Sequence, residues 1–190
     1  DASLKVAAGE QVMLSGRSGS GKSTLLRALG GLWRDGDGHI RLPAEPYLFL
    51  PQKPYLPIGT LREALSYPQG AEVYPAERFA QVLETCRLSH LTSRLDESNH
   101  WQRMLSPGEQ QRVAFARALL SQPRWLYMDE ATSAMDEEDE AVLYQALIDE
   151  LPDVTLISIG HRSSLKRFHR RLLRIDGGQL LEQPHPHAVV

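Results

Sequence analysis

The sequence predicts an α/β fold, in which a mainly parallel sheet is covered by helices and carries a small helical subdomain over residues 53–120. Strand-like and helix-like hydrophobic patterns alternate on both sides of that insertion, which is typical of parallel sheets. Inside it, short helical patterns lie among prolines and polar turns. The sheet core is therefore expected over residues 1–52 and 121–182, followed by a loose tail over 183–190.

Hydrophobic spacing, with the glycines and prolines between the runs, places the individual elements. A partly apolar run at 11–15 ends in a Gly/Ser cluster, and leucines at helical spacing follow over 22–29. Glycines at 30, 31 and over 35–38 end that helix. The predicted strands are 4–6, 11–15, 39–42, 47–50, 125–128 and 155–159, and the predicted helices are 22–29, 60–66, 76–86, 88–95, 106–120 and 136–151.

Composition limits the class of protein. Of the 190 residues, 42% are hydrophobic and 24% charged, which excludes disordered and collagen-like chains. The net charge of −3 provides no global basic field, so no nucleic-acid partner is expected. The single cysteine, Cys86, disfavours both a disulfide framework and a cysteine zinc site, and we expect an idle or buried thiol.

A glycine-rich segment between the first predicted strand and helix carries the strongest functional signal. It reads GRSGSGKST and satisfies the pattern G-x-x-x-x-G-K-[ST], which predicts a P-loop NTPase with a RecA-like sheet core. Its glycines let backbone N–H groups wrap around phosphates, and the following helix adds its positive dipole end. Lys22 is expected to reach the β- and γ-phosphates, and Ser23 to offer its hydroxyl to Mg²⁺. The expected ATP contacts are Gly16, Arg17, Ser18, Gly19, Ser20, Gly21, Lys22, Ser23 and Thr24.

Two carboxylates follow the apolar strand predicted at 125–128. Asp129 and Glu130 would lie at the carboxyl edge of the sheet, where ligands bind in open α/β folds. Because adjacent residues on a strand point apart, we assign Asp129 to the Mg²⁺ shell and Glu130 to the general base that activates water. An acidic pair after a strand is, by itself, more often part of a solvated turn than of a functional site. Because this chain also contains the phosphate loop, the functional interpretation is favoured here.

The segment Ser106-Pro107-Gly108-Glu109 has two interpretations. Ser at the N-cap, Pro at the first helical position and Glu at the third form a capping box, which needs no further function. A helix start with a small residue and free N–H groups is also an anion site. The segment alone favours the cap.

Several motifs in the same order give the chain a resemblance to the ABC ATPase family. Residues 16–24 match Walker A, and Gln52 in LPQKPY looks like the Q-loop. LSPGEQQR resembles the LSGGQ-type signature, and residues 125–130 resemble Walker B with its glutamate. Ser133-Ala134-Met135-Asp136 is similar to the D-loop, and His161 in SIGHR to the H-loop. Within the family, the chain looks most like peroxisomal fatty-acyl half-transporters and bacterial fused relatives of SbmA/BacA-type permeases.

The resemblance implies shared ATP sites in a head-to-tail dimer of two such domains. Each ATP would lie between Walker A of one subunit and Ser106, Gly108 and Glu109 of the other. Gln52 would contact Mg²⁺ and the attacking water, and His161 the γ-phosphate as a switch. The catalytic set is then Glu130, His161, Gln52 and Lys22, the Mg²⁺ set is Ser23, Gln52 and Asp129, and the D-loop set is Ser133 and Asp136.

The resemblance further implies a transport-coupled ATPase beside a transmembrane domain. We expect that domain to be fused N-terminally, and the ATPase to lie at the cytoplasmic face of a membrane, the bacterial inner membrane. In the family an aromatic residue that stacks on adenine precedes Walker A, and here we expect it upstream of Asp1. Pro107 and Glu109 replace the commoner Gly and Gln, and Met135 replaces Leu, yet an active site is expected.

Other function classes are weighed against this interpretation. A DNA-repair ABC ATPase carries a very long coiled coil between Walker A and signature, and only residues 53–104 separate Gln52 from the signature here. A ribosome-acting member, which pairs two cassettes in one chain, stays open. A regulatory domain that binds nucleotide without hydrolysing it tends to lack the residues that correspond to Glu130 and His161, and both are present here. A P-loop kinase does not require the signature and D-loop segments that this chain contains.

Overall fold

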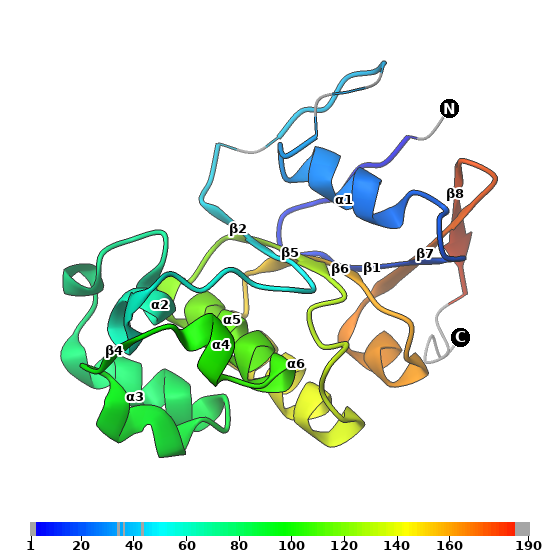
Figure 1. Ribbon diagram of the computed structural model, residues 1–190. Helices are drawn as coiled ribbons and strands as arrows, with labels where there is room; N and C mark the ends of the chain where they lie inside the picture. The colour runs from blue at the N-terminus through cyan, green and yellow to red at the C-terminus, as the bar shows by residue number, and fades with distance from the viewer. Residues whose placement is uncertain (1–2, 34, 36, 43, 185–190) are drawn as a thin grey trace. The chain divides into compact units, whose positions relative to one another are not determined.

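Figure 1 shows the computed structural model, which describes residues 3–33, 35, 37–42 and 44–184. The chain forms two compact units: the first lies within the ranges 1–49, 123–130 and 152–190, and the second within 50–122 and 131–151. The predicted division differs, because it placed the helix at 136–151 with the sheet. That helix packs against the long helix of the second unit, and Arg78 of that unit pairs with Glu150 at 2.5 Å.

A six-stranded sheet forms the first unit, in the order β2-β5-β6-β1-β7-β8. β1 pairs in parallel with β6 and β7, β5 pairs in parallel with β6, and β7 pairs antiparallel with β8. The mainly parallel sheet that the sequence predicts is thus present. The strands are β1 (Gln11–Gly16), β2 (Tyr47–Leu50), β5 (Trp125–Asp129), β6 (Thr155–Ile159), β7 (Arg171–Asp176) and β8 (Gln179–Gln183).

Helix α1 (Lys22–Leu29) packs on the sheet, in contact with β1, β5 and β6 (Figure 1). Leu26 of α1 is fully buried in one cluster with alternate residues of β1, β5 and β6 and with one residue of β7. Burial of such a leucine contributes about 1.5–3 kcal/mol. Strands β5 and β6 are buried along their whole length, as expected for strands covered on both faces. The strand members of the cluster are Val12, Leu14, Trp125, Tyr127, Ile157, Ile159 and Leu173.

Two predicted strands of the first unit are wrong. Residues 4–6 and 39–42, all described, form no strand. Ile40 and Leu42 are exposed, and a strand needs a hydrogen-bonded neighbour that these residues lack in the described part of the chain. Conversely, β7 and β8 were not predicted. The tail expected over 183–190 lies mostly outside the described residues.

Helices make up the second unit, with α5 at its centre. α5 packs against α2, α3 and α6, and nine of its residues are buried. The predicted helix at 88–95 is a 3-10 turn, Ser89–Arg94. The helices are α2 (Leu61–Ser66), α3 (Ala76–Thr85), α4 (Trp101–Met104), α5 (Pro107–Ser121) and α6 (Glu137–Glu150). The second unit also contains a 3-10 turn at Ala71–Val73 and a short antiparallel pair of strands, β3 (Gly59–Thr60) and β4 (Ser98–Asn99). A further 3-10 turn, Ser163–Phe168, belongs to the first unit.

A buried arginine of α5 fixes the segment that follows Gln52. Arg117 donates to the carbonyl oxygens of Ala64, at 2.6 Å, and of Tyr55, at 3.1 Å. Burial lowers the pKa of Arg117 to about 10, which leaves the guanidinium charged at neutral pH. Cys86 is buried as expected, and no helix in the described ranges is long and apolar enough to cross a bilayer.

Candidate nucleotide-binding site

The first unit holds a cleft of about 250 Å³ at the carboxyl ends of β1, β5 and β6. Six of its lining residues belong to the glycine-rich loop and the start of α1. The other two lie within two residues of the carboxyl ends of β5 and β6, so three strand ends converge here, as at ligand sites of open α/β sheets. The lining residues are Ser18, Gly19, Gly21, Lys22, Ser23, Thr24, Glu130 and His161.

Glycine is required at two turns of the loop. Gly16 has φ 147°, and a Cβ there would lie 2.7 Å from the carbonyl oxygen of Ile175 and 2.8 Å from the Ser20 hydroxyl. Gly21 caps α1 in the left-handed region at φ 92° and provides no side-chain hydrogen bond to the helix. The first N–H groups of α1 therefore face the cleft without a side-chain cap, which suits an anion.

Lys22 spans the mouth of the loop. Its Nζ donates to the carbonyl oxygens of Gly16 at 3.0 Å and Arg17 at 2.9 Å, and the residue is only 6% exposed. The buried Ser20 hydroxyl has no hydrogen-bond partner among the described residues. A buried cation and an unsatisfied donor in one loop fit a phosphate group, since such groups are otherwise costly to bury.

A hydroxyl and a carboxylate meet beside the loop. Ser23 Oγ donates to Asp129 Oδ1 at 2.8 Å, and Asp129 Oδ2 lies 3.8 Å from the Arg27 guanidinium. No group of three His, Cys, Asp or Glu side chains that could hold a metal occurs in the described ranges. Mg²⁺ needs no such cage, because it is held by one or two protein oxygens together with substrate phosphates and water. The Ser23–Asp129 pair fits that ion.

Glu130 points to a different partner from Asp129. Glu130 Oε1 lies 2.8 Å from His161 Nε2, and the Glu130 backbone N–H donates to the carbonyl oxygen of Ile159 at 3.1 Å. Glu130 has φ 50°, a left-handed conformation that costs free energy for a residue with a side chain and is common at functional sites. The backbone thus holds this carboxylate at the cleft with His161.

Gln52 and the D-loop residues form a second cluster, in the second unit. Gln52 Nε2 donates to Ser133 Oγ at 3.4 Å. Gln111 of α5, which the sequence reasoning missed, joins them: its Nε2 donates to the Gln52 carbonyl oxygen and to Ser133 Oγ, and its Oε1 accepts from the Ala134 N–H. Gln111 is buried. Its only sequence signal is an amide on a helix face that otherwise carries alanine and phenylalanine.

The predicted signature residues begin α5. Ser106 is the N-cap, and the capping box with Glu109 is complete: Glu109 Oε2 accepts from the Ser106 N–H and hydroxyl at 2.9 and 2.8 Å. Glu109 Oε1 lies 2.9 Å from His90 Nε2. Burial alone would raise the pKa of Glu109, but the bonds from Ser106 and His90 hold it below its ordinary value. The carboxylate is therefore charged at neutral pH.

The D-loop lies against this helix start. A Cβ on Gly108 would lie 3.1 Å from the carbonyl oxygen of Ala134, a tight contact that favours glycine here. Asp136, predicted as a D-loop contact, is the N-cap of α6 and accepts from the Asp139 N–H at 2.7 Å. The structure thus gathers Lys22, Asp129, Glu130 and His161 in one unit, and groups Gln52 with the signature and D-loop residues in the other.

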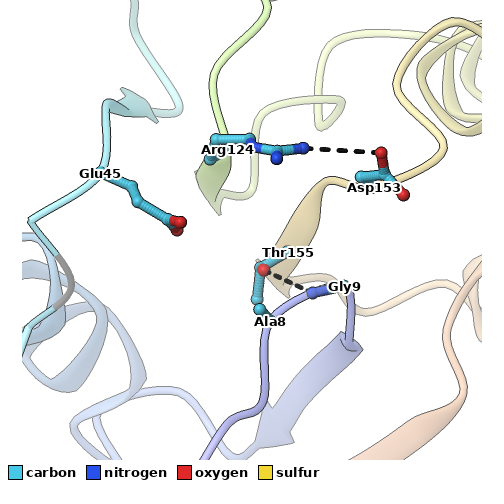
Figure 2. Close-up of a pocket in the computed structure, with 6 residues that line it drawn as sticks. All are labelled: Ala8, Gly9, Glu45, Arg124, Asp153 and Thr155. Carbon is cyan, nitrogen blue, oxygen red and sulfur yellow. Dashed lines mark hydrogen bonds and ion pairs between the residues drawn. The ribbon is translucent and has the colours of Figure 1, made fainter.

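A second cleft of about 290 Å³ lies at the opposite, amino-terminal ends of β5 and β6 (Figure 2). Its charged side chains are Glu45, Arg124 and Asp153, and Arg124 pairs with Asp153 at 3.5 Å. Glu45 accepts from the Trp125 indole at 2.9 Å. With two carboxylates and a single, paired cation, this cleft does not suit a triphosphate.

Comparisons with known proteins agree with the geometry. The family model described as "ABC transporter" matches residues 1–133. An uncharacterized ABC transporter ATP-binding protein of Haemophilus influenzae is 46% identical over 90% of this chain and 29% of its own length. The human lysosomal cobalamin transporter ABCD4 is 44% identical over 94% of this chain and 31% of its own length. The chain thus spans less than a third of either relative.

A solved structure confirms the fold class. The structure of a bacterial Atm1-family ABC exporter with ATP bound superposes with a TM-score of 0.83 and 28% identity, over 96% of this chain and 35% of that one. The predicted P-loop NTPase fold is confirmed, and the relatives include sub-family D members, in agreement with the predicted branch. The model match covers more than half of the chain, and the chain therefore belongs to the ABC transporter family.

Proposed function

We propose that this chain is the ATP-hydrolysing motor domain of an ABC transporter. The observation that carries the proposal is the convergence of Lys22, the Ser23–Asp129 pair and the Glu130–His161 pair on one cleft. A buried cation, an oxygen pair and a carboxylate with an imidazole are the groups that phosphoryl transfer to water requires.

Each group has a proposed task. When ATP binds, Lys22 gives up its hydrogen bonds to the loop carbonyl oxygens and binds the β- and γ-phosphates. Glu130 accepts the proton of the attacking water, and His161 orients that carboxylate and contacts the γ-phosphate. Because an ionised carboxylate only accepts, His161 Nε2 carries the hydrogen of their 2.8 Å bond, and the same N–H would reach the γ-phosphate when ATP is bound. Gln52, whose carbonyl oxygen accepts from Gln111 within the second unit, is proposed to contact Mg²⁺ and the attacking water, as the family resemblance implies.

The oxygens of Ser23 and Asp129 would hold Mg²⁺. When bound, this ion neutralises charge on the phosphate oxygens. Arg27, whose guanidinium lies 3.8 Å from Asp129, helps to hold that carboxylate in place.

The signature and D-loop cluster supports a second, identical domain as partner. Ser106 and Gly108 lie at the start of a fifteen-residue helix whose positive dipole end suits the γ-phosphate bound by the other subunit. Glu109 brings a negative charge to that position, and the contact with His90 offsets it when the imidazole is protonated. Two sites would form at once, each closed by the other subunit.

A transmembrane domain is the other proposed partner, which places the chain at the cytoplasmic face of a membrane, the bacterial inner membrane. Exposed apolar side chains soon after Gln52 support a docking surface: Tyr55 is 61% and Ile58 71% exposed, and Tyr67 stacks edge-on against Tyr55. The relatives that align with 90% and 94% of this chain are described as ABC transporter proteins or as a transporter.

Hydrolysis that depends on Mg²⁺ and on Asp129 tests the proposed ATPase. The chain should release phosphate from ATP with Mg²⁺ and stop with EDTA. Asp129→Asn should raise the Mg²⁺ concentration for half-maximal rate by about tenfold or more, since the loss of ~1.4 kcal/mol of binding is a factor of ten. Asp153→Asn, in the other cleft, is the matched control and should not change it. An unaltered Mg²⁺ requirement in Asp129→Asn would reject the assignment.

A further inference from the structure

A buried histidine lies behind the cleft and takes no part in the proposed chemistry. His169 follows the 3-10 turn Ser163–Phe168 and is 2% exposed. Its Nε2 lies 2.5 Å from the hydroxyl of Ser158 on β6, and its Nδ1 lies 2.8 Å from the carbonyl oxygen of Leu165. Ser158 is fully buried.

The Leu165 carbonyl oxygen fixes one ring nitrogen of His169 as a donor. A carbonyl oxygen only accepts, so Nδ1 carries the hydrogen and donates to Leu165. Nε2 then accepts from the Ser158 hydroxyl in the neutral ring. His169 therefore joins the strand β6 to the turn with a donor on one side and an acceptor on the other, a pair of bonds that no apolar side chain reproduces.

The segment between these two anchors carries His161. Leu165 is buried over Gly160, where a Cβ would lie 2.5 Å from Leu165 Cδ1. Gly160 immediately precedes His161, whose Nε2 reaches Glu130 at 2.8 Å. The contacts thus run from Ser158 through His169 and Leu165 to Gly160. They hold the chain before His161, at Ser158 and Gly160, and after it, at Leu165 and His169.

We propose that His169 is a positioning residue for His161: with Ser158 it holds Leu165 against Gly160, so that the His161 imidazole is fixed toward Glu130 and the γ-phosphate. The inference rests on the proposed function, because it needs His161 to act on the γ-phosphate. It adds a residue that touches neither nucleotide nor water and acts through the backbone beside His161.

The test compares affinities for Mg-ADP and for a Mg-bound ATP analogue with an imide between the β- and γ-phosphates, by calorimetry on the 190-residue chain. The preference of His161→Ala for the analogue over ADP should be lower than that of wild type by roughly tenfold, the loss expected for one hydrogen bond to a charged group. His169→Leu should show a similar loss. Adding His169→Leu to His161→Ala should change nothing more.

Milder variants guard against misfolding. Ser158→Ala removes one hydroxyl and should lower the preference in the same direction. His169→Asn, whose amide N–H can serve the Leu165 carbonyl, should retain more of it than His169→Leu. Thr155→Val removes another buried hydroxyl from β6, the one that accepts from the Gly9 N–H, and is the matched control with an unchanged preference.

The outcomes separate the two proposals. If His161→Ala keeps the wild-type preference, the proposed role of His161 fails and the inference falls with it. If His161→Ala loses the preference while His169→Leu and Ser158→Ala keep it, the inference alone is overturned. Equal weakening of ADP and analogue binding in the His169 and Ser158 variants would show a purely structural role and also overturn it.

Discussion

Glu130→Gln should bind ATP as wild type does and hydrolyse it about 10²–10⁴-fold more slowly, the contribution of a positioned general base. The amide side chain has the same size as the carboxylate side chain, so residue 130 can keep its left-handed backbone conformation beside His161. It cannot accept the proton of the attacking water. Single-turnover release of phosphate measures the rate, and calorimetry with Mg-ATP measures the binding.

The matched control is Glu77→Gln, an exposed glutamate in the first turn of α3. It should hydrolyse ATP at the wild-type rate. Full turnover in Glu130→Gln would remove Glu130 from the role of base. Slow turnover combined with weak binding would instead assign the carboxylate to nucleotide binding.

Lys22→Ala should lose ATP hydrolysis to background and weaken ATP binding by about 10- to 100-fold, because a hydrogen bond to a charged group contributes about 1.5–3 kcal/mol. The effect on rate should exceed the effect on binding, since charge on the phosphate oxygens is also stabilised in the transition state. Nζ already lies across the loop, bonded to Gly16 and Arg17, so little movement is needed to reach a phosphate.

Lys5→Ala removes an exposed lysine from the same unit and should leave both measurements unchanged. Phosphate release by Lys22→Ala near the wild-type rate would contradict the assignment of the phosphate loop. A thermal melt of the variant shows whether the loss of the two loop hydrogen bonds also lowers its stability.

Local chemistry explains which parts could be predicted from the sequence. The phosphate loop was predicted because its glycines, its lysine and the strand and helix around it are contiguous, and β1 and α1 lie where the pattern places them. The sequence predicted different partners for Asp129 and Glu130, and the structure pairs them with Ser23 and His161. The physical reason differs from the predicted strand alternation, because β5 ends at Asp129 and Glu130 follows in a left-handed conformation. The capping box at Ser106 is likewise a local pattern.

Features that depend on distant partners were not predictable in this way. The strand expected at 39–42 has no neighbour in the described part of the chain, whereas β7 forms because β1 and β8 flank it. Helix α6 reads as another sheet-covering helix, and only its packing on α5 groups it with the second unit. Gln111 and His169 act through contacts across 59 and 11 residues of sequence, which spacing alone does not reveal.

The central claim is that two copies of this domain close around ATP and reopen on hydrolysis, and the molar mass of Glu130→Gln in solution tests it most directly. Removal of the γ-phosphate should break the link between Lys22 of one subunit and Ser106 and Gly108 of the other. Light scattering on the variant should therefore give the mass of a dimer with Mg-ATP and that of a monomer with Mg-ADP. A Glu130→Gln protein that is saturated with ATP and still has the mass of a monomer would contradict the shared site.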